Sequence, residues 1–251
     1  NVLNSKYFRN RHRYSRKYFS RDTKFSFPRL VTFFCRLAFG GMNREAFGFL
    51  LELGGPGASI KIGGGTISKA RKKLKPAVFR ELLHKAVGFV YRQSPHLERP
   101  AGMRIVAIDG SRLSLPETPD IRAHFGPAKK RTGTEGPPQA RASVCMDVLN
   151  GIIIDALIRP LRWGERRMAA KHLRFLGRND LVLLDRGYAG VDFFKRILCT
   201  GADICARVKA GHSTEITRFV ASGRTSALIH LHDSDGLLEL RAVRIELSSG
   251  S

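Results

Sequence analysis

An aliphatic run that ends in a charged turn limits the choice of fold more than any other part of the sequence. Residues 181–188 have the sequence LVLLDRGY. Four consecutive aliphatic residues are typical of a strand that is buried on both faces, as in the centre of an α/β sheet. The run ends at Asp185, and the glycine two residues later allows the chain to turn. Because ligands of open α/β sheets bind beyond the carboxyl ends of the strands, we expect Asp185 at the functional edge.

A second stretch has the same pattern. Residues 104–111, with the sequence RIVAIDGS, place Asp109 directly after an apolar strand and before a glycine. Two such strands in one sheet predict a pair of carboxylates at the same edge. Paired carboxylates are what a divalent-metal site for phosphoryl transfer requires. Either aspartate alone would more often be a turn or cap residue, so the metal-site hypothesis depends on both.

The charge of the chain favours a polyanionic partner. Its 251 residues contain 44 Lys and Arg against 21 Asp and Glu, which gives a formal net charge of +23. Nucleic acid is favoured over an anionic membrane surface, because the basic residues are spread along the chain rather than gathered on one amphipathic helix. No apolar run approaches the roughly 20 residues that span a membrane. The four cysteines show no C-x-x-C spacing, which argues against a zinc site or a disulfide framework and for reduced thiols.

Two basic regions in the N-terminal part are candidate DNA-binding segments. Residues 1–24 alternate cations with aromatic residues, which suits an arm that follows phosphates and stacks on bases, or equally a flexible solvated tail. From residue 25 the apolar spacing becomes helical. A short helix is predicted after residue 65, and this segment carries five basic residues: Lys69, Arg71, Lys72, Lys73 and Lys75. Residues 25–93 therefore predict a small helical DNA-binding domain, the alternative being a solvated basic face on an ordinary helix pair.

The rest of the chain alternates strands with helices. Residues 114–138 predict a long loop, in which Lys129, Lys130 and Arg131 are expected to contact the DNA backbone. The Asn150-Gly151 pair predicts a hairpin between two apolar runs. The elements expected around and after the hairpin are strands 140–149 and 152–158, helix 166–176, strand 181–185, helix 191–198 and strand 203–208. The order β-β-β-α-β-α-β predicts an α/β domain with a mixed sheet, a ribonuclease-H-like catalytic core over residues 103–210.

Several blocks of the sequence resemble one family. The blocks are residues 108–111 (IDGS), 138–142 (PQARA), 147–151 (DVLNG) and 180–188 (DLVLLDRGY). They are similar to the catalytic-domain blocks of transposases of the insertion-sequence-four family (IS4-like), and residues 68–74 and 79–82 resemble that family's DNA-binding segment. The resemblance implies a DNA transposase of a bacterial insertion sequence. Such an enzyme binds the element ends and catalyses Mg-dependent phosphodiester hydrolysis and strand transfer.

The resemblance also implies roles for individual residues. It makes Asp109 and Asp185 the first two carboxylates of an Asp-Asp-Glu triad. Two Mg²⁺ ions about 3.5–4 Å apart, or Mn²⁺ in their place, would hold the attacking and the leaving oxygen of the displacement. Asp109 is expected to bridge the two ions, and Asp185 is expected to bind one of them. Arg186 would balance charge or touch a phosphate, and Tyr188 would position the turn.

Four other polar residues of this domain are expected to have no part in the chemistry. Asp147 and Asp155 flank the predicted hairpin and are expected to face solvent as strand residues. Glu165 and His172 lie near the start of the connecting helix, where structural roles are expected for both. The resemblance further implies double-stranded DNA as the partner, both transposon ends and target, with a homodimer in the DNA complex. It implies no membrane association and a cytoplasmic, nucleoid-associated location.

The sequence departs from the family in its C-terminal part. The third carboxylate of the family lies in a helix with the pattern Tyr-x-x-Arg-x-x-x-Glu-x-x-x-x-x-x-Lys, but no tyrosine follows Tyr188. We therefore expect a C-terminally truncated fragment that ends within a β-rich insertion, of which residues 211–251 are the start, with a polar turn at residues 230–235. The third ligand would then be absent and this chain alone inactive. The alternatives are a DNA-binding remnant without catalysis and a ribonuclease-H-like nuclease without strand transfer.

Overall fold

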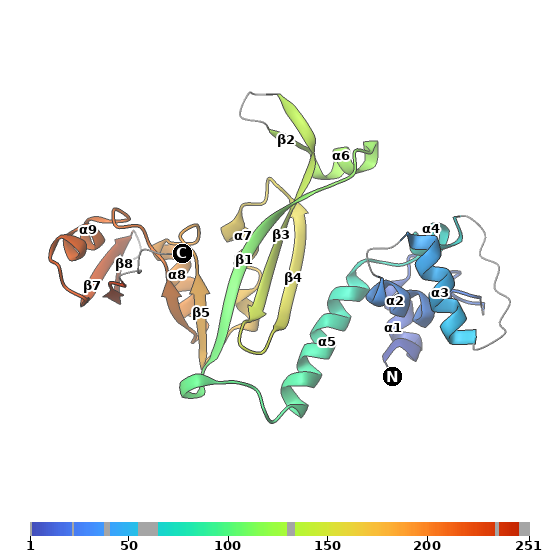
Figure 1. Ribbon diagram of the computed structural model, residues 1–251, viewed down its shortest axis with the longest axis horizontal. Helices are drawn as coiled ribbons and strands as arrows, with labels where there is room; N and C mark the ends of the chain where they lie inside the picture. Colours follow the sequence, from blue (N-terminus) through green and yellow to red (C-terminus); the bar gives the residue numbers. More distant parts are fainter. Residues whose placement is uncertain are drawn as a thin grey trace. The chain divides into compact units, whose positions relative to one another are not determined.

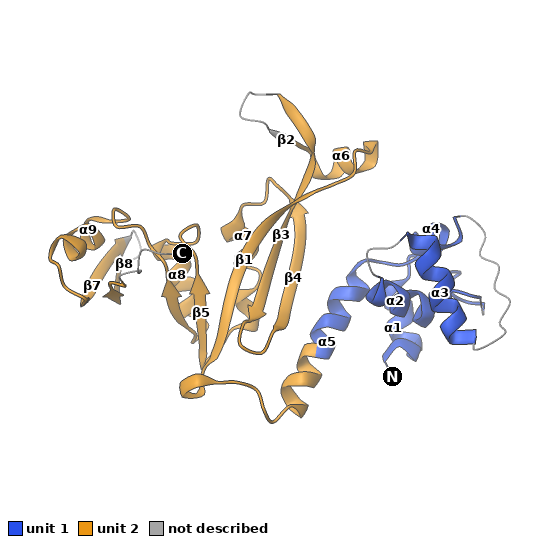
Figure 2. Ribbon diagram, viewed as in Figure 1, with its two compact units in different colours: residues 1–86 blue, residues 87–251 orange. Residues whose placement is uncertain are grey.

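The structure is a computed structural model that describes residues 2–21, 23–37, 41–54, 65–129, 134–233 and 236–245. The chain divides into two units, residues 1–86 and 87–251 (Figure 2). Each unit has its own hydrophobic core, and within the ranges given above one cluster lies in the first unit and two lie in the second. Among the described residues, none of the helices combines the length and the apolar character that crossing a membrane requires.

The first unit is helical. Its elements are η1 (Val2–Asn4), α1 (Lys6–His12), α2 (Phe27–Arg36), α3 (Met42–Gly54), α4 (Thr66–Arg71) and the start of α5 (Ala77–Gln93). Aromatic rings from different helices meet in its core. The ring centroids of Phe8 and Phe27 lie 6.1 Å apart in an edge-to-face arrangement, and those of Phe33 and Phe49 lie 5.6 Å apart. Such pairs add to the free energy gained by burying the rings.

Residues 1–24 differ from the arm or tail that the sequence suggested. Residues 6–12 form helix α1, and the Phe8 side chain is only 2% exposed in the core of the first unit. Arg13 forms an isolated antiparallel bridge with Leu74, and the amide of Lys75 donates to the His12 carbonyl at 2.9 Å. The apolar residue at position 8 therefore packs rather than stacking on a base, whereas Tyr7 and Tyr14 remain exposed.

The second unit contains the sheet. Its elements are η2 (Pro100–Gly102), β1 (Arg104–Ser114), α6 (Pro119–Phe125), β2 (Pro127–Lys129), β3 (Glu135–Asp147), β4 (Ile152–Pro160), α7 (Glu165–Ala169), η3 (Leu173–Phe175), β5 (Asp180–Leu184), α8 (Val191–Leu198), β6 (Asp203–Ala206), α9 (Thr214–Ala221), β7 (Ser226–Asp233) and β8 (Gly236–Val243). Strands β7 and β8 form a separate antiparallel pair. The prediction of a mixed α/β fold is confirmed.

The main sheet has antiparallel and parallel parts. Strand β3 pairs antiparallel with β1 on one side and with β4 on the other, which is the predicted meander. Strand β5 pairs parallel with both β1 and β6, and helices α7 and α8 precede and follow β5 in the chain (Figure 1). Val182 and Leu184 of β5 are buried in the core beside Val106 and Ile108 of β1. This packing fixes the two strands that carry Asp109 and Asp185 next to each other.

Several predicted elements differ from the structure in extent or type. Strand β1 continues to Ser114, so Asp109 lies within the strand rather than at its end. The predicted loop 114–138 contains helix α6 and strand β2. Thr118 caps α6 by accepting a hydrogen bond from the Ile121 amide. The predicted helix 166–176 is divided into α7 and η3, and residues 230–233 belong to strand β7 rather than to a polar turn. The remaining residues of that predicted turn, 234 and 235, lie outside the described part of the chain.

Candidate functional site

Asp109 and Asp185 lie on neighbouring parallel strands. The register of β1 and β5 pairs Arg104 with Asp180 and Ala107 with Leu183. Continued two residues further, this register brings Asp185, just past the end of β5, level with Asp109. Adjacent strands are about 4.8 Å apart. Both side chains are exposed, while the residues before them, Ile108 and Leu184, are buried, so both carboxylates lie on the same side of the sheet.

A glycine follows each of these aspartates, and the two glycines have different surroundings. A Cβ atom on Gly110 would stand 3.3 Å from the Tyr188 hydroxyl and 3.4 Å from Cγ of Glu165. A Cβ atom on Gly187 would stand 3.2 Å from Oδ1 of Asp185 and 3.6 Å from Oε2 of Glu165. Gly110 follows Asp109 in strand β1, so its Cβ direction points to the opposite face of the sheet, where Tyr188 and Glu165 lie. We call Asp109 and Asp185, on neighbouring strands, the carboxylate cradle.

Tyr188 ends the turn after Asp185, and its ring lies in the core of the second unit. Its side chain is 1% exposed, and its hydroxyl has no hydrogen-bond partner among the residues that the structure describes. Burial raises the pKa of this phenol well above its ordinary value, and the negative charges of Asp109, Glu165 and Asp185 raise the pKa further. The phenol therefore remains protonated and can donate one hydrogen bond.

Glu165, for which a structural role was expected, opens helix α7. Its Oε1 accepts a short hydrogen bond from Arg141 of β3. Arg141 is level with Arg112 of β1 and so shares the sheet face of Ile108 and Gly110, which places Glu165 on the face opposite Asp109. Within the described ranges, no three His, Cys, Asp or Glu side chains are already grouped closely enough to hold a metal ion.

The turn after Asp185 is held by its own hydrogen bonds. Oδ1 of Asp185 accepts a hydrogen bond from the Gly187 amide at 2.8 Å. The guanidinium of Arg166 donates to the Gly187 carbonyl at 3.3 Å and also to the Ala189 carbonyl. Arg186 is exposed. Arg166 thus links helix α7 to the predicted active turn.

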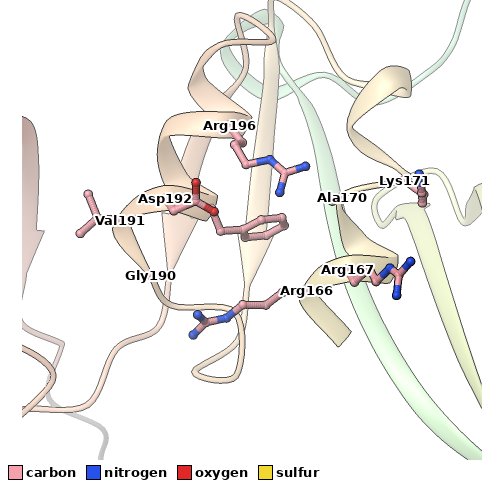
Figure 3. Close-up of a pocket in the computed structure, with 9 residues that line it drawn as sticks. Arg166, Arg167, Ala170, Lys171, Gly190, Val191, Asp192 and Arg196 are labelled. Carbon is pink, nitrogen blue, oxygen red and sulfur yellow. The ribbon is translucent and has the colours of Figure 1, made fainter. Parts of the chain in front are cut away.

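A basic cavity of about 470 Å³ lies between α7 and α8. Its cationic lining residues are Arg166, Arg167, Lys171 and Arg196, with Asp192 as the acidic one. Figure 3 shows Arg196 extending from α8 toward this space and Arg166 reaching toward Gly190. Sequence reasoning named none of these cations. Their number and their closeness to the turn after Asp185 suit the binding of an anion such as a phosphate.

The predicted DNA-binding cations of the first unit lie on and after α4. Ile67, Ala70 and Leu74 are buried and anchor this segment in the core. The exposed cations are Lys69, Arg71, Lys72 and Lys73. Lys75 is half-buried, and its Nζ donates to the Arg11 carbonyl at 3.2 Å. Of the second predicted set, Lys129 ends β2, while Lys130 and Arg131 lie outside the described residues.

Ser143, His172 and Asp155 form a hydrogen-bonded chain that is buried. Nδ1 of His172 lies 2.9 Å from Oδ2 of Asp155, and Nε2 lies 3.0 Å from Oγ of Ser143. The same order of groups serves nucleophilic catalysis in hydrolases. Here all three side chains are at most 1% exposed, so no substrate reaches the serine and the chain of hydrogen bonds is structural.

The expectation that Asp147 and Asp155 face solvent is wrong. Both are buried, at 1% and 0% exposure. Asp155 pairs with His172, and Oδ2 of Asp147 accepts a hydrogen bond from the Tyr91 hydroxyl at 2.9 Å. Strand alternation alone could not reveal this, because the partners are 17 and 56 residues away in the sequence.

Comparison with known proteins gives a family match and several relatives. The family model described as "Transposase DDE domain" matches residues 100–243. The chain is 25% identical over 134 residues to the transposase InsG for insertion sequence element IS4 of Escherichia coli (strain K12), which covers 53% of this chain and 30% of InsG. It is 27% identical over 92 residues to the putative transposase InsZ of the same strain, covering 36% of this chain and 31% of InsZ. The chain thus spans less than a third of the length of these curated relatives.

Two solved structures are similar at a low level. The first is a piggyBac transposase synaptic complex with hairpin DNA, with a TM-score of 0.36 and 13% identity, covering 74% of this chain and 44% of that chain. The second is a Mos1 transposase paired-end complex with the left transposon end, with a TM-score of 0.26 and 10% identity, covering 76% of this chain and 61% of that chain. Both similarities are weak.

Proposed function

Because this chain belongs to the DDE transposase family, with IS4-like relatives, we propose that it binds the ends of a bacterial insertion sequence and carries two carboxylates of a Mg-dependent transposition site. The reaction would be phosphodiester hydrolysis followed by strand transfer to target DNA. The observation that carries the proposal is the parallel pairing of β1 with β5, whose register leads to Asp109 beside Asp185. The ribonuclease-H-like character of the sheet is part of the same proposal.

The residues of the carboxylate cradle fit a divalent cation. Carboxylate oxygens are the ligands that Mg²⁺ prefers, and the register of β1 and β5 brings Asp109 and Asp185 level with each other. When bound, a pair of Mg²⁺ ions supplies activation of the attacking oxygen and stabilisation of the leaving oxygen. Asp109 and Asp185 would bind the ions. Tyr188 would hold the turn from beneath, since its ring is buried in the core.

Basic residues of both units would bind the phosphates of the DNA. Arg186, next to Asp185, would contact the phosphate nearest the reacting bond. In the first unit, the exposed cations of α4 would follow a DNA backbone, and Lys75, Lys129, Lys130 and Arg131 are proposed to add to this contact. The high net charge of +23 supports a polyanionic partner. Pairing of two subunits on two DNA ends belongs to the proposal as well.

Removing charge from α4 should weaken DNA binding. Substituting Lys69, Arg71 and Lys72 by Gln removes three cations that face solvent. The plot of log affinity against log salt concentration should become less steep by up to about 2.7, because each neutralised phosphate contact adds about 0.9 to the slope. Fluorescence anisotropy with a labelled duplex at several salt concentrations measures this slope.

A matched variant separates this effect from a change in net charge. Lys209, Arg218 and Arg224 are exposed cations of the second unit, away from the proposed DNA-binding segment in sequence. Their triple substitution by Gln removes the same charge and should leave most of the slope unchanged. Equal changes in the two triple variants would contradict a DNA-binding role for α4.

The function itself is tested by measuring metal binding, DNA binding and DNA products. We expect the chain to bind Mn²⁺ by calorimetry and to bind duplex DNA in a salt-sensitive way. Supercoiled plasmid incubated with Mg²⁺ and a version of the chain extended by a helix that supplies the third carboxylate then distinguishes the alternatives. Hydrolysis products without joined strands favour a ribonuclease-H-like nuclease, and DNA binding without any affinity for Mn²⁺ favours a DNA-binding remnant. Joined products, absent when a chelator is added, support the transposase.

A further inference from the structure

We propose that the basic cavity between α7 and α8 binds a backbone phosphate of the DNA on which the protein acts. This site rests on the proposed function, because that function makes DNA the partner. It adds a phosphate contact on the second unit to the contacts proposed for Arg186 and for α4. Neither α7 nor α8 was among the segments that the sequence predicted to bind DNA.

The lining of the cavity favours an anion. Its volume of about 470 Å³ lies within the range of roughly 300–1,000 Å³ that is usual for ligand sites. Pockets for neutral small molecules are mostly apolar, whereas this lining contains four basic side chains and one carboxylate, that of Asp192. The basic residues are Arg166, Arg167, Lys171 and Arg196. A surplus of positive charge around one space is best balanced by a negatively charged ligand.

Two of the four basic side chains are available to such a ligand. Lys171 and Arg196 are exposed, and neither makes a hydrogen bond, an ion pair or a ring contact with any residue that the structure describes. Asp192 lies four residues before Arg196 on α8, yet within the described part of the chain these two form no ion pair. Figure 3 shows Arg196 extending from α8 toward the cavity. Both side chains can therefore turn to an incoming phosphate.

Arg166 joins the cavity to the turn after Asp185. Its guanidinium donates to the carbonyls of Gly187 and Ala189. These bonds occupy Nε and Nη2, and an arginine has five N–H donors in all, so Nη1 keeps donors for a phosphate oxygen. Nη1 is the end beside Gly190, because a Cβ atom on that glycine would stand only 3.0 Å from it. A phosphate held by Arg166 thus lies next to the turn that follows the β5 carboxylate.

The cavity belongs to the sheet face that the Asp109 side chain does not share. Ala169 of α7 and Phe193 of α8 pack in one core cluster with Ile108 of β1. Successive side chains of a strand point to opposite faces, so Asp109 points away from this core. The phosphate in the cavity is therefore not the one that reacts at the metal. It is another phosphate of the same DNA, where the backbone passes the edge of the sheet.

DNA suits this cavity better than a free anion does. A free phosphate gains a single contact, whereas a phosphate of bound DNA adds to contacts made elsewhere, each of which releases counterions. The net charge of +23 attracts a polyanion to the protein. The guanidinium groups of Arg166 and Arg196 also match the spacing of two phosphate oxygens.

Binding of a labelled duplex at several salt concentrations tests the site, with fluorescence anisotropy as the measurement. The variant Lys171→Gln/Arg196→Gln removes two exposed cations and leaves Arg166 in place to hold the turn. The plot of log affinity against log salt concentration should become less steep by about 0.9, the value for one phosphate contact, because both side chains bind the same phosphate. The control Arg178→Gln/Arg224→Gln removes the same charge from exposed positions that do not line the cavity, and it should keep the slope.

Trp163 provides a local signal from the cavity. It is the sole tryptophan of the chain, and the guanidinium carbon of Arg167 lies 4.0 Å from the centre of its ring. Saturating duplex DNA should change the fluorescence of Trp163 in the unmodified chain and in the control variant. The change should be lost in Lys171→Gln/Arg196→Gln, because the phosphate no longer enters beside Arg167. The melting temperature checks that both variants are folded.

The outcomes separate this site from the proposed function. If the unmodified chain binds no duplex DNA, the proposed function fails and the site fails with it. If the chain binds DNA but the two double variants behave alike in slope and in fluorescence, the cavity makes no DNA contact and only the present inference is overturned. If sodium phosphate changes the fluorescence of Trp163 and duplex DNA does not, the cavity binds a free anion, which overturns the inference as well.

Discussion

The Asp109→Asn variant should bind Mn²⁺ roughly tenfold to a hundredfold more weakly than the unmodified chain. Even residues that only support a metal ligand typically change the affinity by this factor, and Asp109 is proposed to bind the ion directly. Asparagine has nearly the same volume but no charge, so the sheet should keep its structure. Calorimetric titration with Mn²⁺ measures the affinity, and the melting temperature checks that the fold is intact.

DNA binding should survive the same substitution. Asp109 is a negative group, so its removal takes away repulsion rather than attraction for phosphate. Asp203 is the matched control, since it is an exposed aspartate at the amino end of β6, the opposite edge of the sheet from Asp185. Asp203→Asn should bind Mn²⁺ like the unmodified chain. An Asp109→Asn variant with undiminished Mn²⁺ affinity would remove the metal-site proposal.

Local sequence patterns predicted the elements that surround the site. The helix expected over residues 191–198 is α8, with the same bounds, because a glycine precedes it and its apolar spacing is regular. The Asn150-Gly151 pair joins β3 to β4 as a hairpin, with Gly151 at a φ of 66°, a value that glycine adopts without strain. Two aliphatic runs followed by Asp predicted strands that deliver both carboxylates to one sheet edge, and β1 and β5 are neighbouring parallel strands. Burial on both faces was expected for residues 181–184, but buried and half-buried residues alternate along β5. The metal-binding role of Asp109 and Asp185 stays a prediction.

Contacts between distant residues could not be predicted in this way. Glu165 meets Arg141 across 24 residues, and nothing in the residues around either one encodes that meeting. Phe8 looked like part of a basic arm because its neighbours are cations, yet it packs against Phe27 of the first unit. In each case the local pattern is compatible with several environments, and only the three-dimensional packing selects one.

Loss of the buried Asp155–His172 pair should lower the free energy of unfolding of the second unit substantially. His172→Ala leaves the Asp155 carboxylate in the core without the imidazole that lies 2.9 Å away, and it also opens a cavity between β3, β4 and η3. Removing one partner of a buried pair costs about 3–5 kcal/mol of unfolding free energy. For a unit of this size, such a loss should lower the melting temperature of the second unit by roughly 6–20 °C. Differential scanning calorimetry measures the shift.

An exposed pair in the same unit provides the comparison. Nε2 of His230 lies 3.0 Å from Oε2 of Glu239, a similar distance, but the two side chains are 50% and 57% exposed. Water and salt screen such a pair, so His230→Ala should cost at most about 1 kcal/mol. The chemical groups and the distance are nearly the same in the two pairs, and burial is what differs. Equal melting shifts for His172→Ala and His230→Ala would therefore mean that the hydrogen-bonded chain from Ser143 to Asp155 does not stabilise the sheet.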